Sequence, residues 1–195
     1  MEISSKLKKN ILASALIISC SLLSNISMAN AYDGKITFLG KISNATCEIS
    51  GGTGGQESAS PNFTVYLPQV STTAFKQVND RAGDTEFFIK LKGSNCAAGD
   101  GYAIKFEKIS SADFIDPTTG FLKNLRSDGA QHVQLVLSED GQDINFKEKD
   151  TSKSKNRSDK DTETVFNFGV QYIATTADVK PGVVEGNIYY SVVYP

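Results

Sequence analysis

Residues 166–172 read FNFGVQY, and this short stretch indicates which kind of fold the chain adopts. Phe166, Phe168, Val170 and Tyr172 alternate with small or polar residues, which is a period of two. Successive side chains of a β-strand point to opposite faces, so this pattern places one face in a core and the other in water. The stretch therefore predicts a half-buried strand.

The same alternation recurs along the chain. Further runs of this kind occupy residues 36–42, 87–91, 102–106, 133–137 and 188–194. Segments rich in Gly, Asp and Pro separate the runs, and no long stretch has a convincing helical period. Many short strands in a chain of 195 residues predict one all-β domain, built as an antiparallel sandwich.

The composition excludes several classes of function. The chain has 20 basic and 22 acidic residues, one histidine and no tryptophan, so it is not a strongly basic nucleic-acid binder. One histidine excludes a multi-histidine metal site, and we expect this residue, His132, to lie on the surface. Nucleophile-elbow and phosphate-loop motifs are also missing from the sequence. We therefore expect no enzymatic activity, no cofactor, no metal and no nucleic-acid partner.

The first 31 residues have the layout of a secretory signal peptide. Three lysines precede a charge-free apolar stretch at 11–26, which is a little short and serine-rich for a membrane span. Small residues then suggest cleavage after Ala31, with a cut after Ala29 as the alternative. Cys20 raises the alternative of a lipoprotein, although Ile18 and its serine neighbour suit that processing poorly.

Removal of this segment leaves Cys47 and Cys96 as the remaining cysteines. An even pair in an exported protein predicts one disulfide, and two buried free thiols are the alternative. Closing a loop of this length contributes about 4 kcal/mol to stability in the chain-entropy model.

One segment stands out by its charge. Residues 147–163 hold eleven charged residues, six positive and five negative, and no large apolar side chain. A binding patch is one interpretation, but a solvated insertion between two strands is favoured.

The run at 34–40 lies close to the predicted mature N-terminus and is too short to bury itself. It must pair with a sheet edge, in its own molecule or in another one. The C-terminal run also forms a strand and reaches Tyr194, the penultimate residue.

These elements, in this order, resemble the subunits of chaperone–usher fimbriae, the type 1-like major pilin family. A glycine–aromatic–glycine extension precedes the first cysteine, as in the family; its residues are Gly34, Ile36, Phe38, Gly40 and Ile42, followed by Cys47. Near the C-terminus, the spacing from Gly182 to the penultimate Tyr194 is similar to the family's chaperone-recognition signature. The chain departs from the family in Pro68, where Gly is usual, in a longer Leu91-to-Cys96 spacing, and in the charged segment 147–163.

The resemblance implies an incomplete immunoglobulin-like sandwich, completed by a donor strand from another subunit. A periplasmic chaperone would first fill the gap, and the next subunit's extension would replace it at the outer-membrane usher. Residues 1–31 are then the signal peptide, 32–46 the donor-strand extension and 47–195 the pilin domain.

The resemblance also implies roles for two sets of residues. The donor strand would present Gly34, Ile36, Phe38, Gly40 and Ile42 to the acceptor groove. The groove wall that contacts the chaperone would include Gly182, Ile188, Tyr190, Val192 and Tyr194. Two alternatives are that Ile36 and Phe38 begin a closed sandwich and that Tyr194 is an ordinary core residue.

The expected function is that of a structural subunit in a surface filament used for attachment. Its partners would be other copies, sibling pilins, the chaperone and the usher, with a host-surface receptor as a further candidate. The alternatives are a minor adaptor and a fimbrial adhesin that binds a host glycan. Adhesins of this kind place a lectin domain ahead of the pilin domain, and the pilin-like pattern here leaves no room for one.

Overall fold

The computed structural model describes residue 37 and residues 46–157 and 162–195. The signal-peptide prediction and the donor residues Gly34, Ile36, Phe38, Gly40 and Ile42 lie outside this part of the chain. Among the residues so described, none belongs to a helix that is long and apolar enough to cross a bilayer.

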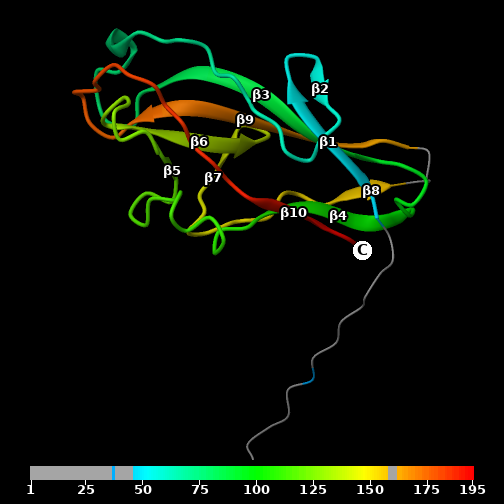
Figure 1. The fold of residues 1–195 in the computed structure, drawn as a ribbon. Helices are drawn as coiled ribbons and strands as arrows, with labels where there is room; N and C mark the ends of the chain where they lie inside the picture. The colour runs from blue at the N-terminus through cyan, green and yellow to red at the C-terminus, as the bar shows by residue number, and fades with distance from the viewer. Residues whose placement is uncertain (1–36, 38–45, 158–161) are drawn as a thin grey trace, which may run out of the picture. The chain divides into compact units, whose positions relative to one another are not determined.

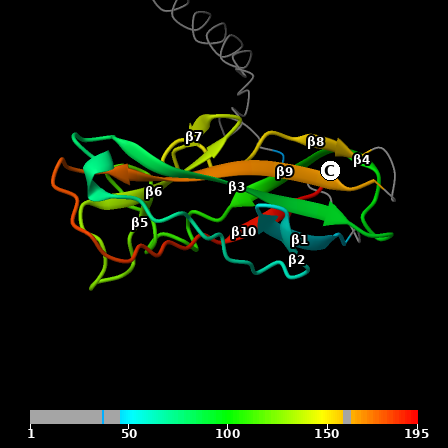
Figure 2. The same ribbon diagram turned by 90° about the horizontal axis from the view of Figure 1, so that it is seen from above.

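The larger of two sheets is antiparallel throughout. Its long central strands lie side by side, as Figure 2 shows. In spatial order the strands are β2 (Gln56–Ser58), β1 (Glu48–Thr53), β3 (Arg81–Lys92), β9 (Thr164–Ala174), β6 (Val133–Glu139) and β5 (Leu122–Lys123), and β7 (Gln142–Ile144) also pairs with β6.

The smaller sheet forms the second layer of the sandwich (Figure 1). It contains β10 (Tyr190–Val193), β4 (Gly99–Phe106) and β8 (Lys155–Arg157), in that order. One 3-10 turn, η1 (Thr72–Ala74), follows β2. The two layers make an all-β sandwich, as the period of two predicts.

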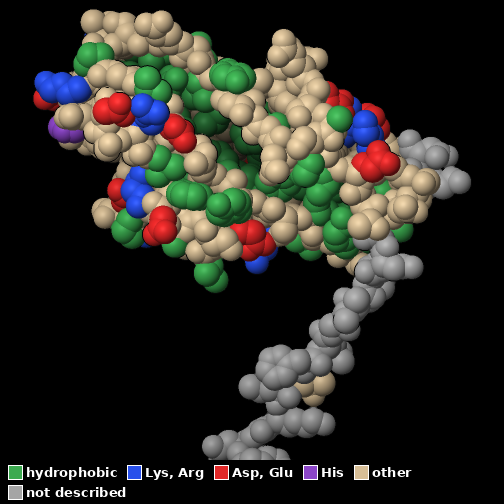
Figure 3. Space-filling view, in the orientation of Figure 1, with side chains coloured by type: hydrophobic (Ala, Val, Ile, Leu, Met, Phe, Trp, Pro, Cys, Tyr) green, Lys and Arg blue, Asp and Glu red, His purple; other side chains and the backbone are tan. Residues whose placement is uncertain are grey.

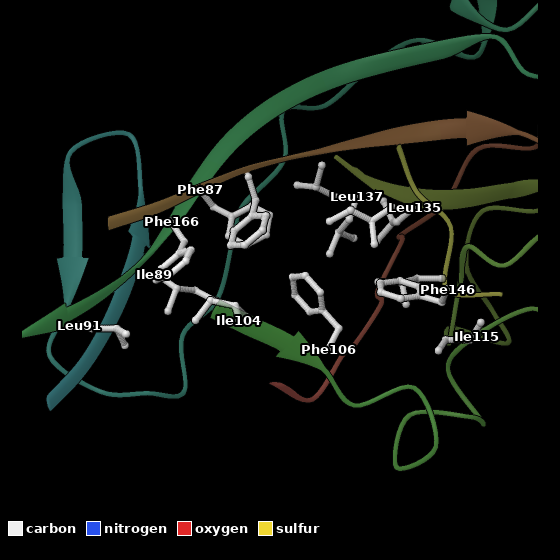
Figure 4. Close-up of a cluster of buried hydrophobic side chains, with 14 of the residues drawn as sticks. Phe87, Ile89, Leu91, Ile104, Phe106, Ile115, Leu135, Leu137, Phe146 and Phe166 are labelled. Atoms are coloured by element: carbon white, nitrogen blue, oxygen red, sulfur yellow. The ribbon is translucent and has the colours of Figure 1, made fainter. Parts of the chain in front are cut away.

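Alternate residues of the long strands fill the space between the sheets (Figure 4). Phe87, Ile89 and Leu91 of β3 are buried, while the residues between them are half-buried. Phe106 of β4 meets Phe168 of β9 edge to face, with ring centroids 5.3 Å apart. Each large apolar side chain buried in this way contributes roughly 1.5–3 kcal/mol relative to its exposed state.

A disulfide joins Cys47 to Cys96, so the pairing expected from the sequence is confirmed. The bond links the residue before β1 to the turn after β3. It therefore cross-links the ends of two neighbouring strands of the larger sheet.

The charged segment 147–163 is more structured than the predicted solvated insertion. It contributes β8, an edge strand paired with β4, and Arg157 at its end is buried. Ser152 donates its backbone N–H to the carbonyl of Ile104, and its hydroxyl accepts the N–H of Ile104. Backbone pairing needs no apolar side chains, so the strand forms although its sequence is polar.

Candidate strand-acceptor groove

Two extended segments of the chain belong to neither sheet. Residues 62–71 lie in the connection from β2 to η1, and residues 182–189 lead into β10. Both run along the same side of the sandwich (Figures 1 and 2). They form the two walls of a groove.

The first wall is unpaired along its backbone. Within the described ranges, residues 63–70 form no backbone hydrogen bond to another segment. Its side chains nevertheless alternate: Phe63, Val65 and Leu67 pack against the core, whereas Tyr66 is 79% exposed. The segment therefore has the side-chain alternation of a β-strand, but in the described ranges its backbone is not paired with a neighbouring strand.

The second wall is paired on one edge. The carbonyls of Val183, Glu185 and Tyr189 accept hydrogen bonds from the N–H groups of Ala130, Leu125 and Glu107, at 2.8–2.9 Å. In an extended chain the N–H and C=O groups of alternate residues point to opposite edges. In the part of the chain that the structure describes, the backbones of residues 184, 186 and 188 have no hydrogen-bond partner. The edge that faces the first wall is open.

The C-terminal residues singled out from the sequence line this second wall. Ile188, Tyr190, Val192 and Tyr194 are half-buried and pack against the core, so they share one face. Their proposed contact with a chaperone remains a prediction.

Gly182 is exposed and plays a different part. A Cβ at this position would collide with the backbones of Gly129 and Ala130. The glycine thus permits two main chains to approach closely at the start of the second wall.

One end of the groove lies near η1. A cavity of about 610 Å³ lies there, and Figure 3 shows hydrophobic side chains gathered in the hollow. The apolar part of its lining includes Leu67, Val70, Phe75, Val133, Tyr172 and Val184. The cavity is large enough for a bulky apolar side chain that enters from between the walls.

Two tyrosines at the C-terminal end of the second wall form hydrogen bonds to distant segments. The Tyr190 hydroxyl donates to the carbonyl of Pro61 at 2.7 Å, and burial raises the pKa of this phenol to about 12. The Tyr194 hydroxyl accepts the N–H of Cys47 at 3.3 Å. The sequence places both residues on the wall but does not predict these bridges.

The first wall was not predicted as part of the site. The signal was available, because Phe63, Val65 and Leu67 have the same parity, but the segment follows the turn-rich residues 51–61 and is interrupted by Pro68. Proline lacks an N–H and is found at sheet edges, which suits a wall with no partner.

Nothing in the described ranges resembles a catalytic or metal centre. No cluster of three or more metal-ligating side chains occurs among those residues. His132 lies at the surface, where its Nδ1 is 2.8 Å from the Thr176 hydroxyl. The groove itself is made of open backbone edges and an apolar cavity.

The chain folds as an immunoglobulin-like β-sandwich with an open groove beside its last strand. The chain belongs to the fimbrial protein family, because the family model described as "Fimbrial protein" matches residues 36–195. This is a family of fimbrial structural proteins and not of enzymes, and its members form fimbriae on the cell surface.

Similar proteins agree with this assignment. The chain is 33% identical over 170 residues to the F17 fimbrial protein of Escherichia coli, covering 84% of this chain and 88% of that one. It is 35% identical over 173 residues to the major fimbrial subunit SMF-1 of Stenotrophomonas maltophilia, covering 85% and 95%.

Solved structures share the fold. An antigen and type I fimbria protein of Burkholderia pseudomallei has a TM-score of 0.53 at 25% identity, covering 76% of this chain and 99% of that one. A subunit of a chaperone–usher pilus has a TM-score of 0.54 at 15% identity, covering 85% and 97%. The chain is a fimbrial subunit, and such subunits assemble with other subunits.

Proposed function

We propose that this protein is a structural subunit of a chaperone–usher fimbria and polymerises by donor-strand exchange. The observation that carries the proposal is the groove, whose two walls present unpaired backbone edges above an apolar floor. Such edges favour pairing with an additional strand, because unpaired strand edges otherwise promote aggregation.

The donor is residues 32–46 of a second copy. Ile36, Phe38 and Ile42 share one parity, and Lys35, Thr37 and Lys41 have the other, so one face of this extension can fill the groove while its backbone pairs with both walls.

The donor runs antiparallel to the second wall. All strand pairs that the structure describes are antiparallel, and antiparallel ladders are slightly more stable per residue. This direction brings the later part of the extension to the cavity near Val184, so that Ile42 occupies it. Gly34 then lies near Tyr194, where little space remains.

Before assembly, a strand from a periplasmic chaperone occupies the groove, beside Tyr190, Val192 and Tyr194. The subunit is exported through the periplasm and reaches the outer-membrane usher in that complex. At the usher, the extension of the next subunit replaces the chaperone strand. The resulting filament serves attachment, and the likeness to a major fimbrial subunit supports a place in the shaft.

The experiment is strand complementation. A peptide of residues 32–46 is added to protein that lacks this segment, and thermal unfolding is followed by circular dichroism. We expect a higher unfolding temperature, because a ligand that binds only the folded state stabilises it. A peptide with Phe38→Asp is the control and should give a much smaller rise. Equal effects of both peptides, or none from the first, would contradict the proposal.

A further inference from the structure

The groove is bridged where a borrowed strand would have to lie. The Tyr190 hydroxyl, on the second wall, donates to the carbonyl oxygen of Pro61, beside the first wall, at 2.7 Å. The Tyr190 ring also meets the Phe63 ring, with centroids 6.4 Å apart. Together these contacts connect the two walls across the gap.

The bridge rests on a packed support. The Phe63 ring lies against Phe87 of β3, with centroids 6.4 Å apart, and directly over Gly51 of β1. A Cβ at Gly51 would overlap this ring, so the glycine provides the space in which Phe63 sits. Phe63 therefore has a fixed position against which Tyr190 can pack.

The bridge uses an acceptor that faces the groove. The Pro61 carbonyl points toward the opposite wall, since its hydrogen-bond donor comes from there. A strand inserted between the walls would need acceptors of this kind for its own N–H groups. The hydroxyl of Tyr190 and the backbone of an incoming strand thus compete for the same oxygen.

We propose that the Tyr190–Pro61 bridge is an autoinhibitory contact that holds the walls together in the unfilled subunit and must break when a donor strand enters. The inference rests on the proposed function of the groove. It adds a step that limits the rate of strand uptake, at the end of the groove away from the cavity.

The test measures the association rate of a fluorescently labelled peptide of residues 32–46 with the full secreted chain, by anisotropy. Tyr190→Phe removes the hydroxyl and keeps the ring on Phe63. We expect association to be about fivefold faster. Loss of one hydrogen bond worth about 1 kcal/mol lowers the barrier to strand entry by that amount, which corresponds to this change in rate. Thr53→Val is the control, because the Thr53 hydroxyl also donates to a backbone carbonyl, that of Glu86 at 2.7 Å, between β1 and β3 and outside the groove; its rate should equal that of the wild type.

The outcomes separate the two proposals. Equal association rates for wild type and Tyr190→Phe would overturn the bridge and leave strand uptake intact, whereas no peptide binding by any variant would overturn both. A similar acceleration in Thr53→Val would also overturn the bridge, because it would indicate general loosening. If Tyr190→Phe does not fold, Phe63→Leu removes the support of the bridge and should likewise accelerate association; an unchanged rate would count against the bridge.

Discussion

The Nε of Arg157 donates a hydrogen bond to the carbonyl oxygen of Cys96 at 2.9 Å, and the side chain that makes this contact is 2% exposed. Its Nη1 lies 3.4 Å from the carbonyl of Leu91, at the end of β3. The guanidinium thus ties the edge strand β8 to the turn that carries the disulfide. A charged segment is in this way anchored to the core.

Replacing Arg157 with methionine should lower the free energy of unfolding by about 2 kcal/mol, because the Cys96 carbonyl would lose its buried donor. Urea denaturation measures the change. Arg126→Met is the matched control, since the Arg126 side chain forms an exposed ion pair with Asp128 and its replacement should change stability by less than about 0.5 kcal/mol. Equal stability of the two variants would show that the buried contact contributes little.

The buried position of Arg157 could not be predicted from sequence, and the reason is physical. Charged residues are buried only when a specific set of acceptors surrounds them, and here the acceptors include backbone carbonyls at the end of β3 and in the turn after it, more than 60 residues away in sequence. Periodicity cannot reveal them. By contrast, the alternation at 87–91, 102–106 and 166–172 depends only on local sequence, and each of these runs is a strand.

The candidate site also has one part that the sequence predicts and one part that it does not. The shared face of Ile188, Tyr190, Val192 and Tyr194 follows from parity, and the structure places these residues together on the groove wall. The hydroxyl bridge from Tyr190 to Pro61 depends on how two segments 129 residues apart approach each other, which no local pattern encodes. The first wall was missed because its alternation follows a run of turn residues.

The disulfide should contribute substantially to stability. Cys47 and Cys96 close a span of 49 residues, and the chain-entropy model predicts a loss of about 4 kcal/mol when such a cross-link is removed. We expect the double variant Cys47→Ser, Cys96→Ser to show this loss in urea denaturation, and to yield less chaperone-bound subunit. As a control, dithiothreitol should destabilise the wild type and leave the double variant unchanged. An unaltered yield of chaperone-bound double variant would show that the disulfide is dispensable.

Glu57 should make the fold sensitive to acid. A hydrogen bond from Lys90 at 2.8 Å is the main cause that lowers the pKa of Glu57 from its ordinary value of 4.5 to about 2, and a hydrogen bond from the Ser50 hydroxyl adds to it. The carboxylate is thus favoured in the folded state. Its contribution is fully present above pH 4.5 and is lost as the pH falls toward 2.

The measurement for this prediction is the unfolding temperature between pH 2 and pH 5. Glu57→Gln should reduce the slope of its decline with acid relative to the wild type. Glu148→Gln is the control, because this exposed side chain has no ion pair in the described part of the chain. Identical slopes for wild type and Glu57→Gln would show that the Lys90 contact is absent in solution.

Gly34→Arg should prevent polymerisation and leave the chaperone complex intact. Gly34 has the same parity as Ile36 and Phe38, so in the proposed register it faces the groove near Tyr194, whose hydroxyl is already held by the Cys47 N–H. A long charged side chain there would have no room and no partner, and burying an unpaired charge is costly. The variant's own groove is unchanged, so the chaperone should still bind it.

Lys35→Arg is the control for this variant, because residue 35 has the opposite parity and would point away from the groove. Electron microscopy of surface filaments measures polymerisation, and co-purification with the chaperone measures chaperone binding. Filaments from Lys35→Arg but not from Gly34→Arg, with equal chaperone recovery, are expected. Normal filaments from Gly34→Arg would mean that the opposite face of the extension enters the groove, since a one-residue change of register exchanges the two faces of a strand.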